Sequence, residues 1–449
     1  MKALSLIFSL LSAISPTHSN SLDNRIQTAI YEPVKAQIVA RESRELYATE
    51  KNRDLIYGLQ GIEMYPLVQI RNTETNDTFY ASTTDKITLN NVPIDVASLD
   101  TIFPEYQTIW SQVESTEPSY KNIDYSSGFA PMEYTKIPFA VGRFTRPLIK
   151  SSLYNFLPDE FTMWTSGDTI FYSELSPEDS LIREYIKNKY AGLGTMHFSL
   201  DFIVDGDTIS SSGAESTNKF GIKDDVFRVS VRPEYNSVSS WFLSFMNLPF
   251  NYGSRGLNDQ GPAFTHQTEH RICADCADLV VFAYRKYFET AEIEKDLPYT
   301  AATMMISYGE INYLADSMTI RDDGVISYNG EPIPFVSSKG EKGVMSGDVI
   351  LWGYSTETKM CPHTGIILED APTIKYKTVY EDKFSIPNLF NYLTNPIHYP
   401  SVGEYKLVPI LGEPNGILDM NDLCSHTCFD VTKIEPIKDL TVDFSIMRF

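Results

Sequence analysis

The stretch RICADCADLVVFAYRKYF, residues 271–288, places a cysteine at the start of a helix that must be buried. Asp275 is a suitable N-cap, because its carboxylate accepts a hydrogen bond from a backbone N–H that the first helical turn leaves unpaired. The apolar residues that follow recur at three- and four-residue spacing and therefore share one face. Cys276 would lie at the positive end of the helix dipole, which favours thiolate over thiol. We therefore predict that Cys276 is a nucleophile.

A later part of the chain supplies a histidine suited to act as the base. The segments GDVILWG (347–353) and CPHTGIILED (361–370) predict two apolar strands, and His363 begins the second. A cysteine on a helix and a histidine on a strand of the adjacent sheet form a known type of Cys-His pair. We therefore predict that His363 is the base for Cys276.

Together these segments resemble the NlpC/P60 family of papain-like cysteine peptidases, which is related to the CHAP amidases. The family carries D-C-S-G-L, G-D-L-V-F-W and H-V-G-I-Y, and this chain has DCADL at 275–279, GDVILW at 347–352 and HTGII at 363–367. The resemblance implies an α+β fold, in which a helix bearing the cysteine packs on an antiparallel sheet bearing the histidine. The turn LPFNYG (248–253) resembles the family's P-Y-x-W-G-G, which implies that Tyr252 helps to hold the oxyanion site.

The resemblance also implies a third residue that orients the base. The segment YKTVYEDKF (376–384) is expected to return as the strand next to that of His363, and the wider superfamily takes its orienting residue from this strand. Glu381 is the residue we assign to the role, with Asp382 and His398 as alternatives.

Composition excludes some classes of partner. The 37 basic and 59 acidic residues give a net charge of −22, which argues against nucleic acid or an anionic membrane surface as a partner. With 42% hydrophobic residues the chain has ample material for packed cores. No cofactor and no metal are expected.

The N-terminus predicts export. Residues 1–19 carry one lysine and then a short apolar run, followed by Ser15-Pro16, as in a signal peptide. No other apolar run has membrane-spanning length. We expect a secreted or periplasmic protein.

Four parts of the chain are expected. The signal peptide (1–19) precedes a β-rich N-terminal region (20–230) of one or two recognition domains, which includes helices at 22–52 and 177–190. The NlpC/P60-like catalytic domain follows (231–412), with a further helix at 299–316. Residues 413–449 are expected to form a cysteine-bearing tail.

The five cysteines limit the chemistry, because an odd number in an exported protein leaves one unpaired within the chain. If Cys276 is that residue, Cys273 can bridge to Cys361, since each lies within three residues of a catalytic partner, and Cys424 to Cys428. The competing interpretation is a zinc site built from Cys273, Cys276, Cys424 and Cys428, with His426 as a further ligand.

These observations predict a cysteine hydrolase that cleaves an amide bond through a thioester. The family resemblance implies a peptide of the bacterial cell wall as substrate, such as the D-glutamyl to diamino-acid bond of peptidoglycan stems. Two alternatives stay open: an acyltransferase or amidase acting on another amide or ester, and a non-catalytic binding protein on the same scaffold.

Overall fold

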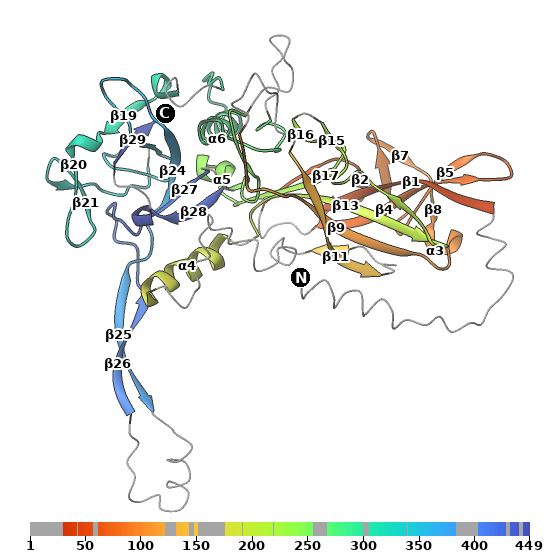
Figure 1. Cartoon of the computed structure of the whole chain (residues 1–449), viewed down its shortest axis with the longest axis horizontal. Coiled ribbons are helices and arrows are strands. Elements are labelled where there is room, and N and C mark those ends of the chain that lie inside the picture. The colour runs from red at the N-terminus through yellow and green to blue at the C-terminus, as the bar shows by residue number, and fades with distance from the viewer. Residues whose placement is uncertain are drawn as a thin grey trace, which may run out of the picture.

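The computed structural model describes fourteen ranges of the chain: 30–42, 44–56, 62–121, 132–142, 148–150, 176–190, 192–218, 220–254, 267–299, 305–338, 340–382, 403–427, 432–439 and 443–449. The architecture is α+β and rich in strands (Figure 1). The predicted signal peptide lies outside these ranges.

Two sheets form the N-terminal region. The first has the order β7-β6-β2-β1-β4-β5-β8, and β12 also pairs with β4. Its strands are β7 (Val92–Ile94), β6 (Ile87–Leu89), β2 (Ala48–Thr49), β1 (Tyr31–Glu42), β4 (Ile62–Asn72), β5 (Thr78–Ser82), β8 (Val96–Ser98) and β12 (Leu148–Lys150). The long antiparallel pair of β1 and β4 is its centre.

The second sheet has the order β11-β9-β13-β17-β3, and β14 also pairs with β13. Its strands are β11 (Tyr134–Gly142), β9 (Gln107–Ser115), β13 (Gly194–Val204), β17 (Phe227–Arg232), β3 (Arg53–Ile56) and β14 (Asp207–Ser210). Smaller elements of this region are α3 (Leu99–Ile102), β10 (Ser119–Lys121), β15 (Thr217–Asn218) and β16 (Gly221–Ile222).

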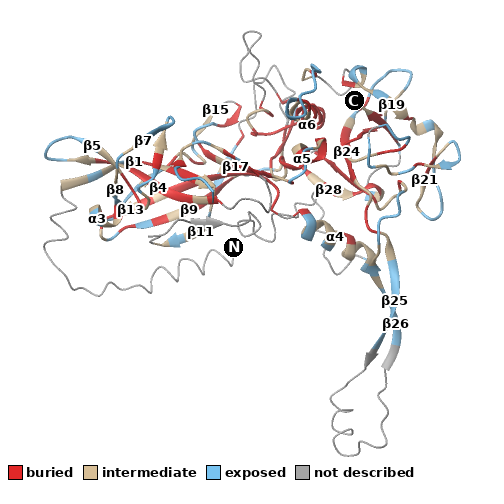
Figure 2. Ribbon diagram, turned by 180° about the vertical axis from the view of Figure 1, so that it is seen from behind, coloured by how far each residue is buried: buried red, intermediate tan, exposed pale blue. Residues whose placement is uncertain are grey.

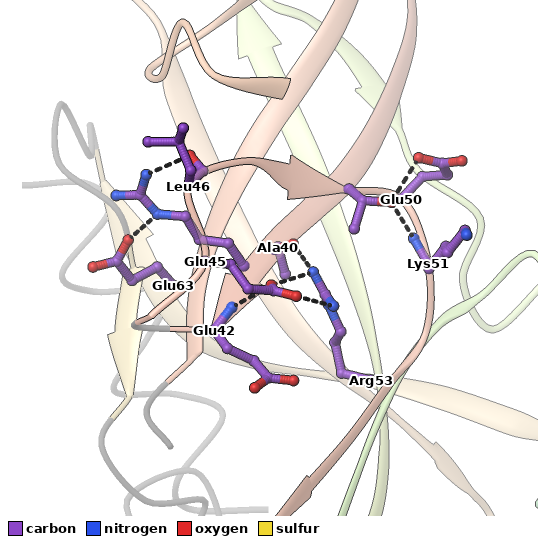
Figure 3. Close-up of polar contacts among 10 residues, drawn as sticks. Ala40, Glu42, Glu45, Leu46, Glu50, Lys51, Arg53 and Glu63 are labelled. Atoms are coloured by element: carbon purple, nitrogen blue, oxygen red, sulfur yellow. Dashed lines mark hydrogen bonds and ion pairs between the residues drawn. The ribbon is translucent and has the colours of Figure 1, made fainter. Parts of the chain in front are cut away.

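A buried arginine connects the two sheets. Arg53 begins β3 in the second sheet, and its Nη2 donates to the carbonyl of Ala40 on β1 of the first at 2.7 Å (Figure 3). The same nitrogen donates to the Glu45 carboxylate at 2.8 Å. A buried guanidinium requires such a counter-charge, so this pair holds the turn after β1 against the second sheet.

The third large sheet lies in the C-terminal half and has the order β19-β29-β23-β24-β27-β28. Its strands are β19 (Glu310–Tyr313), β29 (Phe444–Arg448), β23 (Val349–Trp352), β24 (His363–Glu369), β27 (Leu423–His426) and β28 (Lys433–Pro436). Elements around it include β18 (Phe250–Tyr252), η4 (Ile306–Tyr308), η5 (Ala315–Ser317), β20 (Met318–Ile320), β21 (Ile326–Tyr328), β22 (Glu331–Pro332) and η6 (Ile437–Asp439).

Two helices pack beside this sheet, α5 (Val238–Leu243) and α6 (Cys276–Thr290). The Tyr284 hydroxyl of α6 donates to the carbonyl of Gly347, just before β23, at 2.8 Å. Apolar side chains of α6 share one core cluster with Val349 and Leu351 of β23 and with Ile366 of β24. The predicted helix at the cysteine is therefore confirmed, as are the two strands that follow it.

That core cluster also contains side chains of the N-terminal region. Ile38 of β1, Trp110 of β9 and Phe198 of β13 belong to the same cluster as the α6 side chains. In addition, β10 pairs in parallel with β18. The predicted boundary at residue 230 therefore does not separate two independent cores.

The helix α4 (Pro177–Tyr190) is where the sequence predicts one, but two other predicted helices are wrong in the described residues. Residues 31–42 of the expected helix at 22–52 form β1, because they pair along their length with β4. Within 299–316, the described part forms η4 and β19, and β19 pairs with β29 at the edge of the sheet.

The expected C-terminal tail is also wrong, because β27, β28 and β29 are strands of the third sheet. An ion pair ties the last strand to its neighbour: Arg448 donates from Nε and Nη2 to the two carboxylate oxygens of Asp348, each at 2.7 Å. The Asp348 side chain is 1% exposed. An ion pair with two parallel hydrogen bonds fixes the register of β29 against β23, and each of the two charges neutralises the other.

Two further strands leave the body as a hairpin. After β24 the chain forms β25 (Ile374–Asp382), which pairs only with β26 (Gly403–Leu411) within the described part of the chain. The hairpin projects away from the third sheet, next to α4, and its surface is largely exposed (Figure 2). Among the described residues, no helix has the length and apolar character needed to cross a bilayer.

We expect Asp348→Ala to lower the free energy of unfolding by about 3–5 kcal/mol, because it leaves the Arg448 guanidinium without its counter-charge. The control is Asp323→Ala, which removes an ion pair to Arg321 whose side chains are both half exposed. That change should cost less than about 1 kcal/mol. Chemical denaturation of both variants measures the difference, and equal losses would contradict the structural role of the Asp348–Arg448 pair.

Candidate active site

The predicted nucleophile begins α6. Asp275 is the N-cap, and its carboxylate accepts a hydrogen bond from the backbone N–H of Asp278 at 2.8 Å. Cys276 is buried, with 9% of the residue exposed. This is the position at a helix start that the sequence predicts for it.

The predicted base lies at the start of the adjacent strand. His363 is the first residue of β24 and is partly buried. The hydroxyl of the next residue, Thr364, donates to the carbonyl of Cys276 at 3.1 Å. This bond holds the start of the strand against the start of the helix. The start of α6 thus lies beside the start of β24, although 87 residues separate Cys276 from His363 in the chain. Thr364 faces α6, and the His363 side chain points to the other face of the sheet, where Trp352 lies.

A second histidine and a glutamate extend the site. His363 Nε2 lies 2.9 Å from His426 Nδ1, and His426 Nε2 lies 2.7 Å from a carboxylate oxygen of Glu435. His426 is the last residue of β27 and Glu435 lies on β28, so three adjacent strands each contribute one residue. Lys433 Nζ lies 3.2 Å from the other Glu435 oxygen.

The direction of these hydrogen bonds follows from the carboxylate at their end. Ionised Glu435 only accepts, so His426 Nε2 carries a proton and His426 Nδ1 is an acceptor when the ring is neutral. His363 Nε2 must then donate to it, which leaves His363 Nδ1 with a lone pair. That nitrogen is the one a base needs to take a proton from a thiol.

Burial controls the charge of these groups. Desolvation, with smaller contributions from His426 and Lys433, lowers the pKa of His363 to about 3, so the ring is neutral at physiological pH. Burial of Glu435 acts to raise the pKa of its carboxyl. The hydrogen bond and charge of His426 and the charge of Lys433 outweigh that effect, and the pKa is lowered. The site therefore pairs a neutral imidazole with a distant carboxylate.

Two neighbours hold the His363 ring. The Trp352 indole on β23 stacks against it with the ring centroids 4.8 Å apart and the planes 21° from parallel. On the other side, Gly365 pairs with His426 across the two strands. A Cβ on Gly365 would lie 2.7 Å from the His426 Cβ and 3.0 Å from the Trp352 ring. The glycine of the His-Thr-Gly segment therefore makes room for the close approach of His426 on β27 and of the Trp352 ring.

The third residue assigned from the sequence is not at this site. Glu381 lies on β25, which pairs with β26 and with no strand of the sheet that carries His363. The neighbour of β24 on that side is β27, because the chain leaves the sheet after β24 and returns only at residue 423. His426 takes the expected place of Glu381. Asp382 lies on the same hairpin, and His398 is outside the described residues.

Tyr252 lies near the start of α6. The backbone N–H of Asn251 donates to the carbonyl of Ala274 at 3.0 Å, and the Gly253 backbone is hydrogen-bonded to the Asp275 carboxylate. Tyr252 lies between them and is exposed. The structure thus places it beside the loop that leads into Cys276.

Two carboxyls lie next to the nucleophile. Burial raises the pKa of Asp275, and burial together with the neighbouring Asp275 raises that of Asp278 well above its ordinary value. The Ser254 hydroxyl donates to Asp278. Two buried carboxyls side by side resist double ionisation. The pair therefore adds less negative charge near Cys276 than two solvated aspartates would.

The predicted Cys273–Cys361 disulfide is absent from the structure, in which neither residue is bonded to another cysteine. The Cys273 sulfur accepts a hydrogen bond from Asn251, and the Cys361 thiol donates to the carbonyl of His363. The two sulfurs belong to different hydrophobic clusters. No group of His, Cys, Asp and Glu in the described ranges is arranged to hold a metal ion, and Cys428 lies outside them.

The role of His426 was missed in the sequence, where it entered only as a possible zinc ligand. The signal available was a pair of short segments, LCSH and KIEP, which form adjacent antiparallel strands and carry His426 and Glu435.

The chain matches no known protein-family model, no curated protein and no solved structure.

We expect the His363 ring to stay neutral well below the usual histidine pKa of about 6.5. Protonation occurs as the pH falls through the pKa, so its NMR signal should show no titration from pH 8 down to about pH 4.5. Lys433→Met removes a positive charge that opposes protonation and should raise the His363 pKa. Selective isotope labelling of the seven histidines makes the measurement possible. A His363 midpoint near 6.5 would contradict the buried, neutral site.

Proposed function

We propose that the protein is a cysteine hydrolase that cleaves an amide bond through a thioester intermediate. The observation that carries the proposal is the hydrogen-bonded series His363–His426–Glu435, anchored by Thr364 to the backbone of the residue that would be the nucleophile. A nucleophile, a base and a group that orients the base are the components of a catalytic triad. The fold proposed for this unit is papain-like.

In the first half of the reaction, the Cys276 thiol loses its proton to His363 Nδ1 while the sulfur attacks the amide carbonyl carbon. His363 becomes an imidazolium, and the Glu435 carboxylate stabilises its charge through His426. The imidazolium then gives the proton to the leaving nitrogen, and the C–N bond breaks. An amine and a thioester on Cys276 result.

Water completes the cycle. His363 Nδ1 takes a proton from a water molecule as its oxygen attacks the thioester carbon, and the C–S bond breaks to release the acid. The proton returns to Cys276. The oxyanion in both halves is proposed to be stabilised by the backbone N–H of Cys276, at the helix start, and by the Tyr252 hydroxyl as a second donor.

The substrate class rests on the family resemblance of residues 275–279, 347–352 and 363–367, which places cell-wall stem peptides first. The predicted signal peptide supports it, because a secreted or periplasmic enzyme reaches the cell wall. Peptidoglycan is therefore the substrate to test.

We expect Cys276→Ala and His363→Ala each to lower kcat by about 10⁴-fold or more, since members of such a unit act together. The control is Cys424→Ala, which removes another buried thiol; that thiol donates to the backbone carbonyl of Glu435, and the substitution leaves the Glu435 carboxylate and the rest of the series in place. Mass spectrometry of peptides released from purified peptidoglycan measures activity. A thiol-reactive probe should label the control like the wild type and leave Cys276→Ala unlabelled. Full activity of Cys276→Ala would overturn the proposal.

A separate pair of variants tests the third residue. We expect His426→Ala to lower kcat on the order of 10²-fold or more, because His363 loses the acceptor that fixes its tautomer. Glu381→Gln should leave kcat within about twofold of the wild type, since the hairpin is remote from the imidazole. Glu435→Gln should give an intermediate loss. The reverse order of His426 and Glu381 would restore the assignment made from the sequence.

A further inference from the structure

The hairpin of β25 and β26 is the least covered part of the described structure. Its nine residue pairs run from Ile374 opposite Leu411 to Asp382 opposite Gly403. Its base is anchored: Ile374 and Leu411 pack against the main core, and the Tyr376 hydroxyl donates to Glu178 on α4 at 2.6 Å. The rest projects from the body (Figures 1 and 2).

One face of this hairpin is apolar and exposed. Side chains directly opposite each other share a face, so Tyr380 and Tyr405 lie together, with their ring centroids 5.1 Å apart. Tyr376 is two residues along on the same face, and Leu407 lies opposite Thr378. The exposed fractions are 56% for Tyr376, 41% for Tyr380, 76% for Tyr405 and 69% for Leu407.

An isolated two-stranded hairpin is marginally stable in water, and it gains independent stability with three or more strands or with a covering partner. A contiguous exposed apolar patch is likewise a mark of an interaction site. Every copy of the protein carries this hairpin, so the partner that covers it should be available wherever the protein is present. A second copy of the same chain meets that condition.

The two edges of the hairpin are not equivalent. Pro409 on β26 lies opposite Tyr376 and has no N–H. A ladder tolerates proline only where the missing N–H would point outward, so the outer edge of β26 lacks a donor at this position. By the same alternation, Tyr376, Thr378 and Tyr380 point their backbone N–H and C=O groups outward on β25. The β25 edge is therefore the one able to accept another strand.

We propose that two copies of the protein associate through their β25 edges, antiparallel, about a two-fold axis at Thr378. The product is a continuous four-stranded sheet in the order β26-β25-β25-β26. This contact is isologous, so it closes as a dimer and does not grow into a filament. Within the described part of the chain β25 pairs with no strand other than β26, and the dimer gives both β25 edges a second partner strand in the same step.

The sequence of β25 favours this register. With Thr378 on the axis, Tyr376 of one copy lies opposite Tyr380 of the other, and the pair occurs twice by symmetry. Aromatic pairs across strands stabilise sheets by about 0.2–1 kcal/mol each. Moving the axis to Lys377 would place two lysines opposite each other, which is unfavourable. The other face of the hairpin carries exposed Lys375, Lys377 and Lys406. Their positive charge reduces the repulsion between two copies that each have a net charge of −22.

Sedimentation velocity on the full chain tests association. We expect a dimer at protein concentrations on the order of 10⁻⁵ M and above. Thr378→Pro removes an outward N–H of the β25 edge without touching the bonds to β26, and should give a monomer with activity unchanged. The matched control, Leu407→Pro, removes an outward N–H from the opposite edge at the same rung of the hairpin. It should remain dimeric. A monomeric wild type, or a dimeric Thr378→Pro variant, would overturn the proposal.

A cysteine pair tests the register. Thr378→Cys places two thiols opposite each other on the axis, where the Cα separation of about 5.5 Å in a hydrogen-bonded antiparallel pair lies within the range for a disulfide. Mild oxidation should then give a covalent dimer on a non-reducing gel. Leu407→Cys, exposed on the same face but one strand further from the axis, should stay monomeric under the same conditions. Equal cross-linking of the two variants, or none for Thr378→Cys, would rule out the register.

Discussion

The position of β24 between β23 and β27 is the constraint on which the site depends. Strand pairing places Trp352 on one side of His363 and His426 on the other, and Gly365 leaves the space that both rings occupy. One hydrogen bond from Thr364 then brings the start of α6 to the same corner. The imidazole is thereby oriented by backbone ladders, which are far more rigid than a flexible loop would be.

The electrostatics of this corner favour a neutral resting state. Burial keeps His363 unprotonated, and the buried carboxyl pair of Asp275 and Asp278 resists full ionisation. In the proposed reaction a preformed thiolate–imidazolium pair is therefore disfavoured, and proton transfer would accompany attack on the substrate. Glu435 suits this order of events, because its carboxylate is already ionised when the imidazolium forms. No reorganisation of the carboxylate is then needed.

The part of the site encoded in short patterns was predictable. An N-cap followed by helical periodicity locates Cys276, and a β-branched segment locates His363. His426 was not predictable in this way, because its place depends on a pairing between β24 and β27, and the 53 residues of 370–422, which include the hairpin, separate these two strands in the chain. Glu381 was chosen on the assumption that the next strand along the chain is the next strand in the sheet. That assumption is wrong, because β25 is not part of the third sheet and pairs with β26 instead. No local sequence pattern in 376–384 indicates that the strand leaves the sheet.

The shared core also changes how the N-terminal region can act. Since β10 pairs with β18, the segment 119–121 is hydrogen-bonded to the strand that ends at Tyr252, next to the start of α6. A ligand that shifts this strand would shift a residue proposed for the oxyanion site. A freely tethered recognition domain would have no such contact, because its motion would be absorbed by a linker. Under the proposed function, a substrate bound by the N-terminal sheets would be held in a fixed position relative to Cys276, and the energy of binding its remote groups would help to position the scissile bond.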